Sequence, residues 1–190
     1  MGASIITQLL RPEGVIVGQA TDADGQGRMA QELDSGLLVY RAPGDPEILL
    51  MRAGGPFWSK KKDAGTWSIP KNGAGSGDPL ASARDQFTQD TGLVVEGDFI
   101  ALTPIEQKGG RLLWAYAVAC DLDLTNFRSH DFTLEWPPGS GRMEHFPEIE
   151  RIQYFDLRTA LRKLLPPQWP LLLEAAETLA WPLRRKQAAI

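Results

Sequence analysis

The stretch of sequence from Trp67 to Leu93, WSIPKNGAGSGDPLASARDQFTQDTGL, decides the fold. Its glycine-rich part, residues 72–77, predicts a loop because glycine adopts positive φ angles easily. Asp78 followed by Pro79 predicts a helix start, with a side-chain cap and then proline at the first helical position. Gly92 predicts the end of this helix. The helix carries one buried stripe at helical spacing: Leu80, Ala83, Phe87 and Thr91.

Extended segments are predicted on both sides of this helix. They fall at residues 36–41, 47–52, 67–70, 94–95, 99–102, 111–120 and 152–155. A turn at residues 42–46 makes the first two a hairpin. Asp156 predicts the cap of a second helix, and Pro170 opens a third that runs to about Trp181. Strands around a central helix, with helices at the end, indicate a mixed α/β sandwich.

Composition narrows the class of protein. The chain has 190 residues, 43% of them hydrophobic and 23% charged, which is typical of one globular domain. The longest apolar run, residues 112–120, is far shorter than the roughly 20 residues of a membrane span. One cysteine allows no internal disulfide, and no secretory signal is recognised in residues 1–12. The net charge of −4 does not favour DNA binding. We therefore expect a soluble cytoplasmic protein without DNA or membrane partners.

The segment from Trp67 to Leu93 resembles the Nudix hydrolase box, which reads Gly, five residues, Glu, seven residues, then Arg-Glu-apolar-x-Glu-Glu-x-Gly-apolar. Further segments resemble the same family in the same order: residues 35–41, 54–58, 136–142 and 146–149. The resemblance spans roughly residues 35–165. It implies a Nudix-type α/β/α sandwich with a mixed β-sheet. An N-terminal arm would occupy residues 1–34, and a C-terminal helix with a basic tail residues 166–190.

The box departs from the family pattern where its chemistry is concentrated. Hydrolysis of a nucleoside diphosphate linkage needs a divalent cation, Mg²⁺ or Mn²⁺, held by helix glutamates. The resemblance places the metal ligands at Gln86, Gln89 and Asp90, so that only one of three keeps a charge. The other departures are Gly77 at a glutamate position, Asp85 at the arginine position and Asn72 at a glycine position.

Other candidate site residues follow from the same resemblance. Glu148 is the candidate general base, with Glu144 second, and Gln86 is the box position counted with it as catalytic. The candidates for substrate binding are Lys71, Trp58 and Lys60. The alternative for Glu148 and for the run Lys60–Lys62 is a solvated loop. Trp67 and Trp114 are expected to pack in the core.

Three functional hypotheses remain open. The first is a metal-dependent pyrophosphohydrolase of nucleoside diphosphate-linked substrates with weak or no activity. The second is an inactive nucleotide-binding or protein-interaction module on the Nudix fold. The third is that the two glutamines were engineered, against which stand the further changes at Asn72, Gly77 and Asp85. In each case the expected partner is a nucleotide or a related small molecule, and a homodimer is possible.

Overall fold

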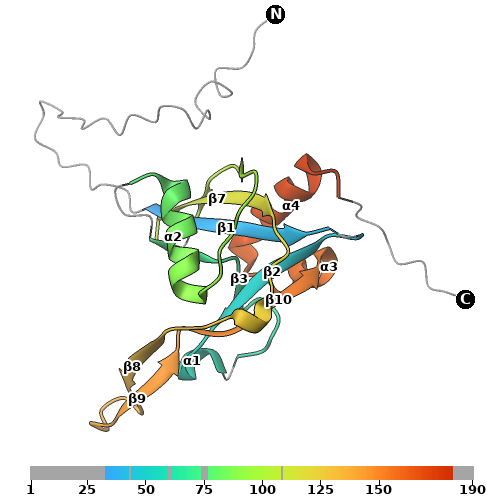
Figure 1. Cartoon of the computed structure of the whole chain (residues 1–190). Helices are drawn as coiled ribbons and strands as arrows, with labels where there is room; N and C mark the ends of the chain where they lie inside the picture. Colours follow the sequence, from blue (N-terminus) through green and yellow to red (C-terminus); the bar gives the residue numbers. More distant parts are fainter. Residues whose placement is uncertain (1–32, 43, 60, 74–76, 108, 182–190) are drawn as a thin grey trace, which may run out of the picture. The chain divides into compact units, whose positions relative to one another are not determined.

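The computed structural model describes residues 33–42, 44–59, 61–73, 77–107 and 109–181 (Figure 1). Its elements, in chain order, are β1 (Leu33–Arg41), β2 (Glu47–Ala53), α1 (Pro56–Ser59), β3 (Trp67–Ser68), β4 (Lys71–Gly73), α2 (Pro79–Thr91), β5 (Ile100–Ala101), β6 (Ile105–Glu106), β7 (Leu112–Ala119), η2 (Leu124–Asn126), β8 (Asp131–Glu135), β9 (Met143–Pro147), β10 (Ile149–Asp156), α3 (Leu157–Lys163), η3 (Pro166–Gln168) and α4 (Trp169–Thr178). The predictions for residues 1–32, for Lys60 and for the basic tail lie outside the described residues.

The main sheet is mixed. Its central order is β10–β2–β1–β7–β5, and the short strands β3, β4 and β6 pair with β2, β1 and β7. β1 and β7 run parallel over their whole length, whereas the other pairs are antiparallel. The predicted hairpin of β1 and β2 is present, with Tyr40 opposite Ile48. The mixed sheet expected from the sequence is therefore confirmed.

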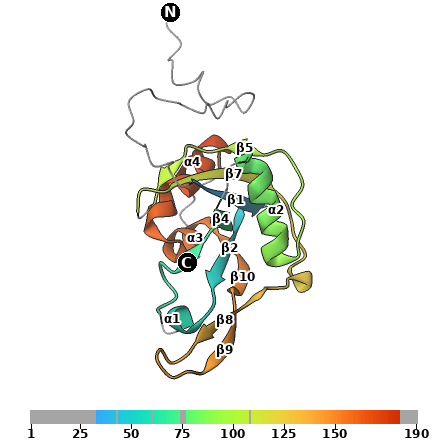
Figure 2. The same ribbon diagram turned by 90° about the vertical axis from the view of Figure 1, so that its left-hand side faces the viewer.

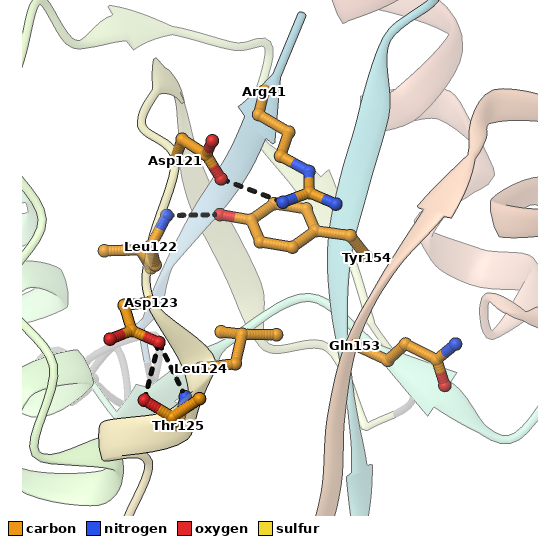
Figure 3. Close-up of a pocket in the computed structure, with 8 residues that line it drawn as sticks. All are labelled: Arg41, Asp121, Leu122, Asp123, Leu124, Thr125, Gln153 and Tyr154. Atoms are coloured by element: carbon orange, nitrogen blue, oxygen red, sulfur yellow. Dashed lines mark hydrogen bonds and ion pairs between the residues drawn. The ribbon is translucent and has the colours of Figure 1, made fainter. Parts of the chain in front are cut away.

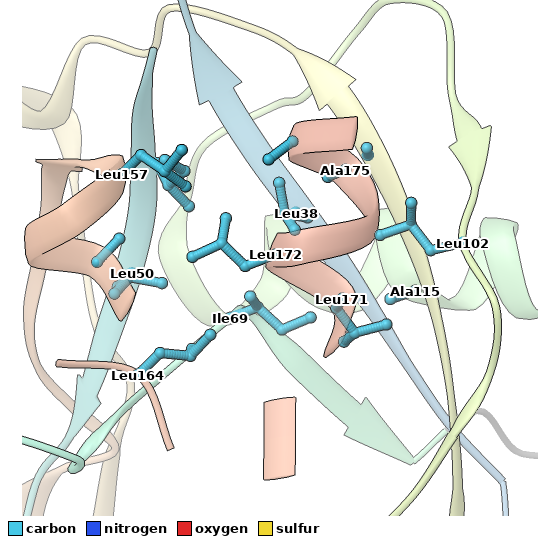
Figure 4. Close-up of a cluster of buried hydrophobic side chains, with 14 of the residues drawn as sticks. Leu38, Leu50, Ile69, Leu102, Ala115, Leu157, Leu164, Leu171, Leu172 and Ala175 are labelled. Atoms are coloured by element: carbon cyan, nitrogen blue, oxygen red, sulfur yellow. The ribbon is translucent and has the colours of Figure 1, made fainter. Parts of the chain in front are cut away.

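Helices cover both faces of this sheet (Figures 1 and 2). Successive strand residues point to opposite faces, so β1 supplies both cores. Leu37 and Val39 pack under α2, and Leu38 packs under α3 and α4 (Figure 4). The side chains that α4 contributes to this second core are Leu171, Leu172, Ala175 and Ala176. Among the residues described, no helix is long and apolar enough to cross a membrane.

A two-stranded hairpin of β8 and β9 projects from the body next to α1 (Figures 1 and 2). Phe132 lies opposite Phe146 in its register, and the two rings are 6.0 Å apart. Phe57 of α1 packs edge-on against Trp136 at the hairpin end, with ring centroids 5.2 Å apart. Aromatic contacts therefore join α1 to the hairpin.

Three local predictions differ from the structure. The loop expected from residue 72 begins instead as β4, because Asn72 and Gly73 pair with Ser35 and Asp34 of β1. Residues 94–95 form no strand, and Val94 is 58% exposed. The β8–β9 hairpin was not predicted, although Asp131–Glu135 alternates polar and apolar side chains.

Candidate functional site

Helix α2 forms as its sequence predicts. The Asp78 carboxylate accepts hydrogen bonds from the backbone N–H groups of Leu80 and Ala81, each at 3.2 Å. Gly92 ends the helix at a φ of 70°, and its N–H donates to the Thr88 carbonyl at 2.8 Å. That left-handed conformation favours glycine, because a Cβ would crowd the carbonyl oxygen. Both ends of the helix are therefore determined locally.

The packing of α2 decides which way its polar residues face. Ala83, Phe87 and Thr91 are buried against β1 and β7, as the stripe predicts, and Leu80 is half-buried. Gln86 and Asp90 lie four residues apart on one flank and are half-buried, whereas Gln89 is exposed. The Gln86 Nε2 atom donates a hydrogen bond to Asp90 Oδ1 at 2.6 Å. The single carboxylate among the three predicted metal ligands therefore already accepts a bond from one of the other two.

The donor set on α2 does not fit a Mg²⁺ cradle. Mg²⁺ prefers oxygen ligands, and in proteins it is held largely by carboxylates. Two of the three predicted ligands are neutral amides. Within the described ranges, no group of three or more His, Cys, Asp or Glu side chains is arranged to hold a metal ion. These residues would offer a divalent cation one carboxylate and two amide oxygens.

The candidate bases lie on another part of the fold. Glu148 is exposed between β9 and β10, and its backbone is fixed at both ends. Its N–H donates to the His130 carbonyl at 2.8 Å, and its carbonyl accepts from the Gly54 N–H at 2.9 Å. Glu144 is half-buried on β9, opposite Leu134. These glutamates belong to the hairpin and its junction with β10, while α2 packs on β1 and β7.

Lys71 lies on the far side of the sheet from α2. It is paired with Gly36 in the β1–β4 register, and paired residues share a face of the sheet. Leu38, two residues along β1 from Gly36, packs under α3 and α4. The Lys71 ammonium accordingly meets Asp34 Oδ2 at 3.3 Å on that side. The structure does not bring Lys71 to the flank of Gln86 and Asp90.

Asp34 is the centre of a polar cluster that the sequence did not reveal. Its side chain is only 6% exposed, and it accepts from Gln107 Nε2 at 2.6 Å, from Lys71 and from Arg111 Nη2. Burial alone would raise the pKa of the Asp34 carboxyl. The Gln107 hydrogen bond and the charges of Lys71 and Arg111 outweigh burial, so this pKa lies below its ordinary value. Asp34 is therefore a buried, ionised carboxylate that links β1 to β4 and to the segment before β7 through its hydrogen bonds, and we call it the ionised clamp.

Trp58 lies on α1 and is half-buried. The Lys61 ammonium sits over its ring, 4.2 Å from the centroid. The buried Arg52 guanidinium donates to the carbonyls of Trp58 and Lys61 at 3.0 and 3.1 Å. Trp67, by contrast, is fully buried edge-on against Phe155, so its predicted role in the core is confirmed.

An open pocket of about 580 Å³ lies at the C-terminal end of β1, beside Arg41, whereas Asp34 lies near the start of this strand (Figure 3). Eight residues line it: Arg41, Asp121, Leu122, Asp123, Leu124, Thr125, Gln153 and Tyr154. The Tyr154 hydroxyl donates to the Cys120 carbonyl at 2.8 Å and accepts from the Leu122 N–H at 3.1 Å. Burial raises the pKa of Tyr154 above its ordinary value, which itself lies well above neutral pH, so the hydroxyl keeps its proton and acts as a donor. This pocket was not predicted, because its residues come from three separate segments.

The pocket is connected to the end of α2. The segment that lines it continues through η2 to Arg128, whose N–H donates to the Thr91 carbonyl at 2.9 Å. Thr91 is the last residue of α2 and follows Asp90. The segment that lines the pocket is thus bonded through its backbone to the end of α2.

A comparison with protein-family models found no match, and a comparison with curated protein sequences found none either. Solved structures do match. The NUDIX domain of Shewanella oneidensis NrtR, complexed with ADP ribose, gives a TM-score of 0.56 at 14% identity over 83% of this chain and 94% of that one. A Caenorhabditis elegans Ap4A hydrolase in a binary complex gives 0.51 at 15% identity, over 77% and 97% of the two chains.

A further match is not described as an enzyme. The C-terminal domain of mouse MUTYH, in complex with human PCNA, gives a TM-score of 0.50 at 11% identity over 82% of this chain and 94% of that one. At these identities the comparisons establish the fold. The chain has the Nudix fold, a mixed β-sheet between helices, as its resemblance to the Nudix box implied.

Proposed function

We propose that this Nudix-fold protein binds a nucleotide or a nucleoside diphosphate-linked ligand and hydrolyses it weakly or not at all. The observation that carries the proposal is the hydrogen bond from Gln86 Nε2 to Asp90 Oδ1, 2.6 Å long. A cation bound to Asp90 would have to compete with this amide donor. Of the three ligand positions, only Asp90 would offer the cation a negatively charged oxygen.

The loss of carboxylates from the predicted ligand positions weakens catalysis for an electrostatic reason. Divalent cations assist phosphoryl chemistry by neutralising phosphate oxygens and orienting the attacking water. An amide oxygen offers a dipole in place of a full charge, so two Glu-to-Gln differences remove two attractive charges from the ion. Binding of the organic part of a ligand depends less on these charges. A site of this kind keeps recognition more readily than turnover.

The structural neighbours support the ligand class. One neighbour is described in complex with ADP ribose, and another as an Ap4A hydrolase. Both ligands contain adenosine attached to a chain of phosphates. We therefore propose ADP-ribose as the first probe, with diadenosine tetraphosphate as the second.

The decisive experiment restores the carboxylates. Calorimetry with Mg²⁺ and Mn²⁺ should show no binding to α2 in the natural protein. The double variant Gln86→Glu with Gln89→Glu should bind the cation and gain hydrolysis of at least one probe. Thr88→Glu is the matched control, because it adds one carboxylate to an exposed position of α2 that matches no predicted ligand. Rapid Mg²⁺-dependent turnover by the unaltered protein, at a rate that Gln86→Glu with Gln89→Glu does not increase, would contradict the proposal.

The predicted roles of individual residues extend this proposal. Glu148 is proposed as the general base of any residual hydrolysis, with Glu144 as the alternative. Trp58, Lys60 and Lys71 are proposed ligand contacts. Replacing each by alanine and measuring the Kd for ADP-ribose tests them singly. Since Lys71 is bonded to Asp34, its replacement needs a parallel measurement of stability.

A second candidate function is a protein-interaction module, here an interface with a second copy of the chain. Phe57 and Met143 are large apolar side chains that are 59% and 62% exposed, near one end of the β8–β9 hairpin. The MUTYH neighbour, bound to another protein, supports such a role for this fold. Sedimentation analysis should then find dimers that Phe57→Ser with Met143→Ser converts to monomers. An absence of dimers at high protein concentration would remove this candidate.

A further inference from the structure

The turn between β2 and α1 meets the junction of β9 and β10, near the base of the hairpin (Figures 1 and 2). Gly54 follows β2 directly, and its N–H donates to the Glu148 carbonyl at 2.9 Å. Trp58 follows a few residues later, in α1, and its N–H donates to the Gly55 carbonyl at 3.2 Å. The backbone of Glu148 is therefore joined to the short segment that carries Trp58.

The contact at Gly54 is so close that no other residue fits there without a shift. A Cβ built on Gly54 would lie 1.9 Å from the Pro147 carbonyl oxygen and 2.9 Å from the carbonyl carbon. The peptide bond that begins at this carbonyl supplies the Glu148 N–H, which donates to the His130 carbonyl at 2.8 Å. Because the clash is with backbone, rotation of a side chain cannot relieve it. A side chain at position 54 therefore displaces either the turn or the junction.

Arg52 holds the same turn from the end of β2. Its side chain is only 8% exposed, and its guanidinium donates to the carbonyls of Trp58 and Lys61 at 3.0 and 3.1 Å. Its Nε atom also lies 3.6 Å from Glu150 Oε2. Glu150 is on β10, two residues after Glu148. One buried side chain therefore connects the backbone around Trp58 with the strand that follows the junction.

Arg52 is a buried cation, and packing alone does not account for it. Burial of a charge is unfavourable, and an apolar side chain of similar size is often at least as stabilising. Arginine differs from such a side chain because its planar fork holds two acceptors at once. The backbone of Trp58 is thereby fixed, while its half-buried ring lies beside the Lys61 ammonium, 4.2 Å from the centroid. An aromatic surface next to a positive charge suits the base and the phosphates of a nucleotide.

We propose that Arg52 and Gly54 are positioning residues of the ligand site, which fix Trp58 before a ligand arrives. Arg52 bonds to the backbone that carries Trp58, and Gly54 lets the turn approach Pro147. Neither residue touches the ligand itself. Fixing a contact in advance reduces the entropy lost on binding, so both residues increase the affinity. The inference rests on the proposed function, because it takes Trp58 as a ligand contact.

Calorimetry with ADP-ribose tests this positioning through a double-mutant cycle. Arg52→Lys keeps the charge but cannot bridge both carbonyls, so it should raise the Kd about tenfold, as the loss of one hydrogen bond to a charged group does. Gly54→Ala introduces the backbone clash and should raise the Kd as well. Combined with Trp58→Ala, neither change should weaken binding beyond Trp58→Ala alone. The matched controls, which should leave the Kd unchanged, are Arg84→Lys at an exposed position of α2 and Gly44→Ala, where a Cβ meets nothing within 4 Å.

Hydrogen exchange without ligand separates positioning from general stability. In Arg52→Lys, exchange should quicken at the amides of Trp58 and Lys61 more than at the core amides of Leu38 and Val39. Equal quickening at all four amides, an unchanged Kd in Trp58→Ala, or effects on the Kd that add to that of Trp58→Ala would overturn the inference and leave the proposed function standing. If the natural protein binds neither ADP-ribose nor diadenosine tetraphosphate, the proposed function fails and the inference fails with it.

Discussion

Replacement of Asp34 by Asn is the sharpest test of how the sheet is held together. The Asp34 carboxylate accepts hydrogen bonds from Gln107, Lys71 and Arg111, which lie 73, 37 and 77 residues away in the chain. Asn keeps the shape of the side chain but removes its charge and one acceptor oxygen. The variant therefore leaves two cations facing a neutral amide inside the same cluster.

The expected cost follows from the exposure of the partners. Breaking a fully buried ion pair costs about 3–5 kcal/mol, and a hydrogen bond to a charged group contributes about 1.5–3 kcal/mol. Lys71 and Arg111 are 26% and 41% exposed, so water rehydrates them in part and reduces the loss. We expect Asp34→Asn to lower the free energy of unfolding by about 2–3 kcal/mol in urea titrations at neutral pH. Asp98→Asn should change it by less than about 0.5 kcal/mol.

The pH dependence gives the refuting outcome. The folded pKa of Asp34 lies below its ordinary value of 3.8, so the carboxylate stabilises the fold fully above that value. As the pH falls through 3.8 towards the lowered folded pKa, the protonated carboxyl comes to resemble Asn. The difference between the natural protein and Asp34→Asn should shrink in that range. A difference that stays constant, or none at neutral pH, would refute the assignment of Asp34 as an ionised clamp.

The remaining predictions concern folding and are checked by chemical denaturation. Phe87→Ala should cost about 3–5 kcal/mol because the ring is 2% exposed under α2, whereas Thr88→Ala on the exposed side should be close to neutral. Equal losses in these two would contradict the orientation of the helix. Gly92→Ala should cost about 1–2 kcal/mol, since φ is 70° there; no loss would mean that the cap relaxes. Asp156→Ala should cost about 1 kcal/mol by removing the cap on Thr159, and an unchanged stability would argue against that bond.

Local signals explain which elements the sequence predicted well. α2 was predicted from Asp78 to Gly92 because a cap, an apolar stripe and a terminal glycine all lie within one short segment. α3 followed from Asp156 in the same way. β4 and the absence of a strand at residues 94–95 depend instead on pairing partners. Asn72 and Gly73 have poor strand propensity, and only the backbone of β1 makes them extended.

In the candidate site, too, some features follow from the local sequence and others depend on strand pairing. Helical periodicity alone places Gln86 and Asp90 on one flank of α2, four residues apart, whereas the hydrogen bond between their side chains was not predicted. The side of the sheet on which Lys71 emerges could not be predicted. It depends on the register of β4 against β1, and a shift of one residue would reverse it.

The sequence by itself determined the central helix, its caps and the loss of acidic side chains from its polar flank, because each of these is set by neighbours within a few residues. Only the tertiary structure decided that Gln107 and Arg111 close around Asp34, and that Arg41, Asp121 and Tyr154 enclose one pocket. These groups are brought together by the parallel pairing of β1 with β7 and by the pairing of β10 with β2. Pairings over such separations arise from burial of the whole sheet, which no short stretch of sequence encodes.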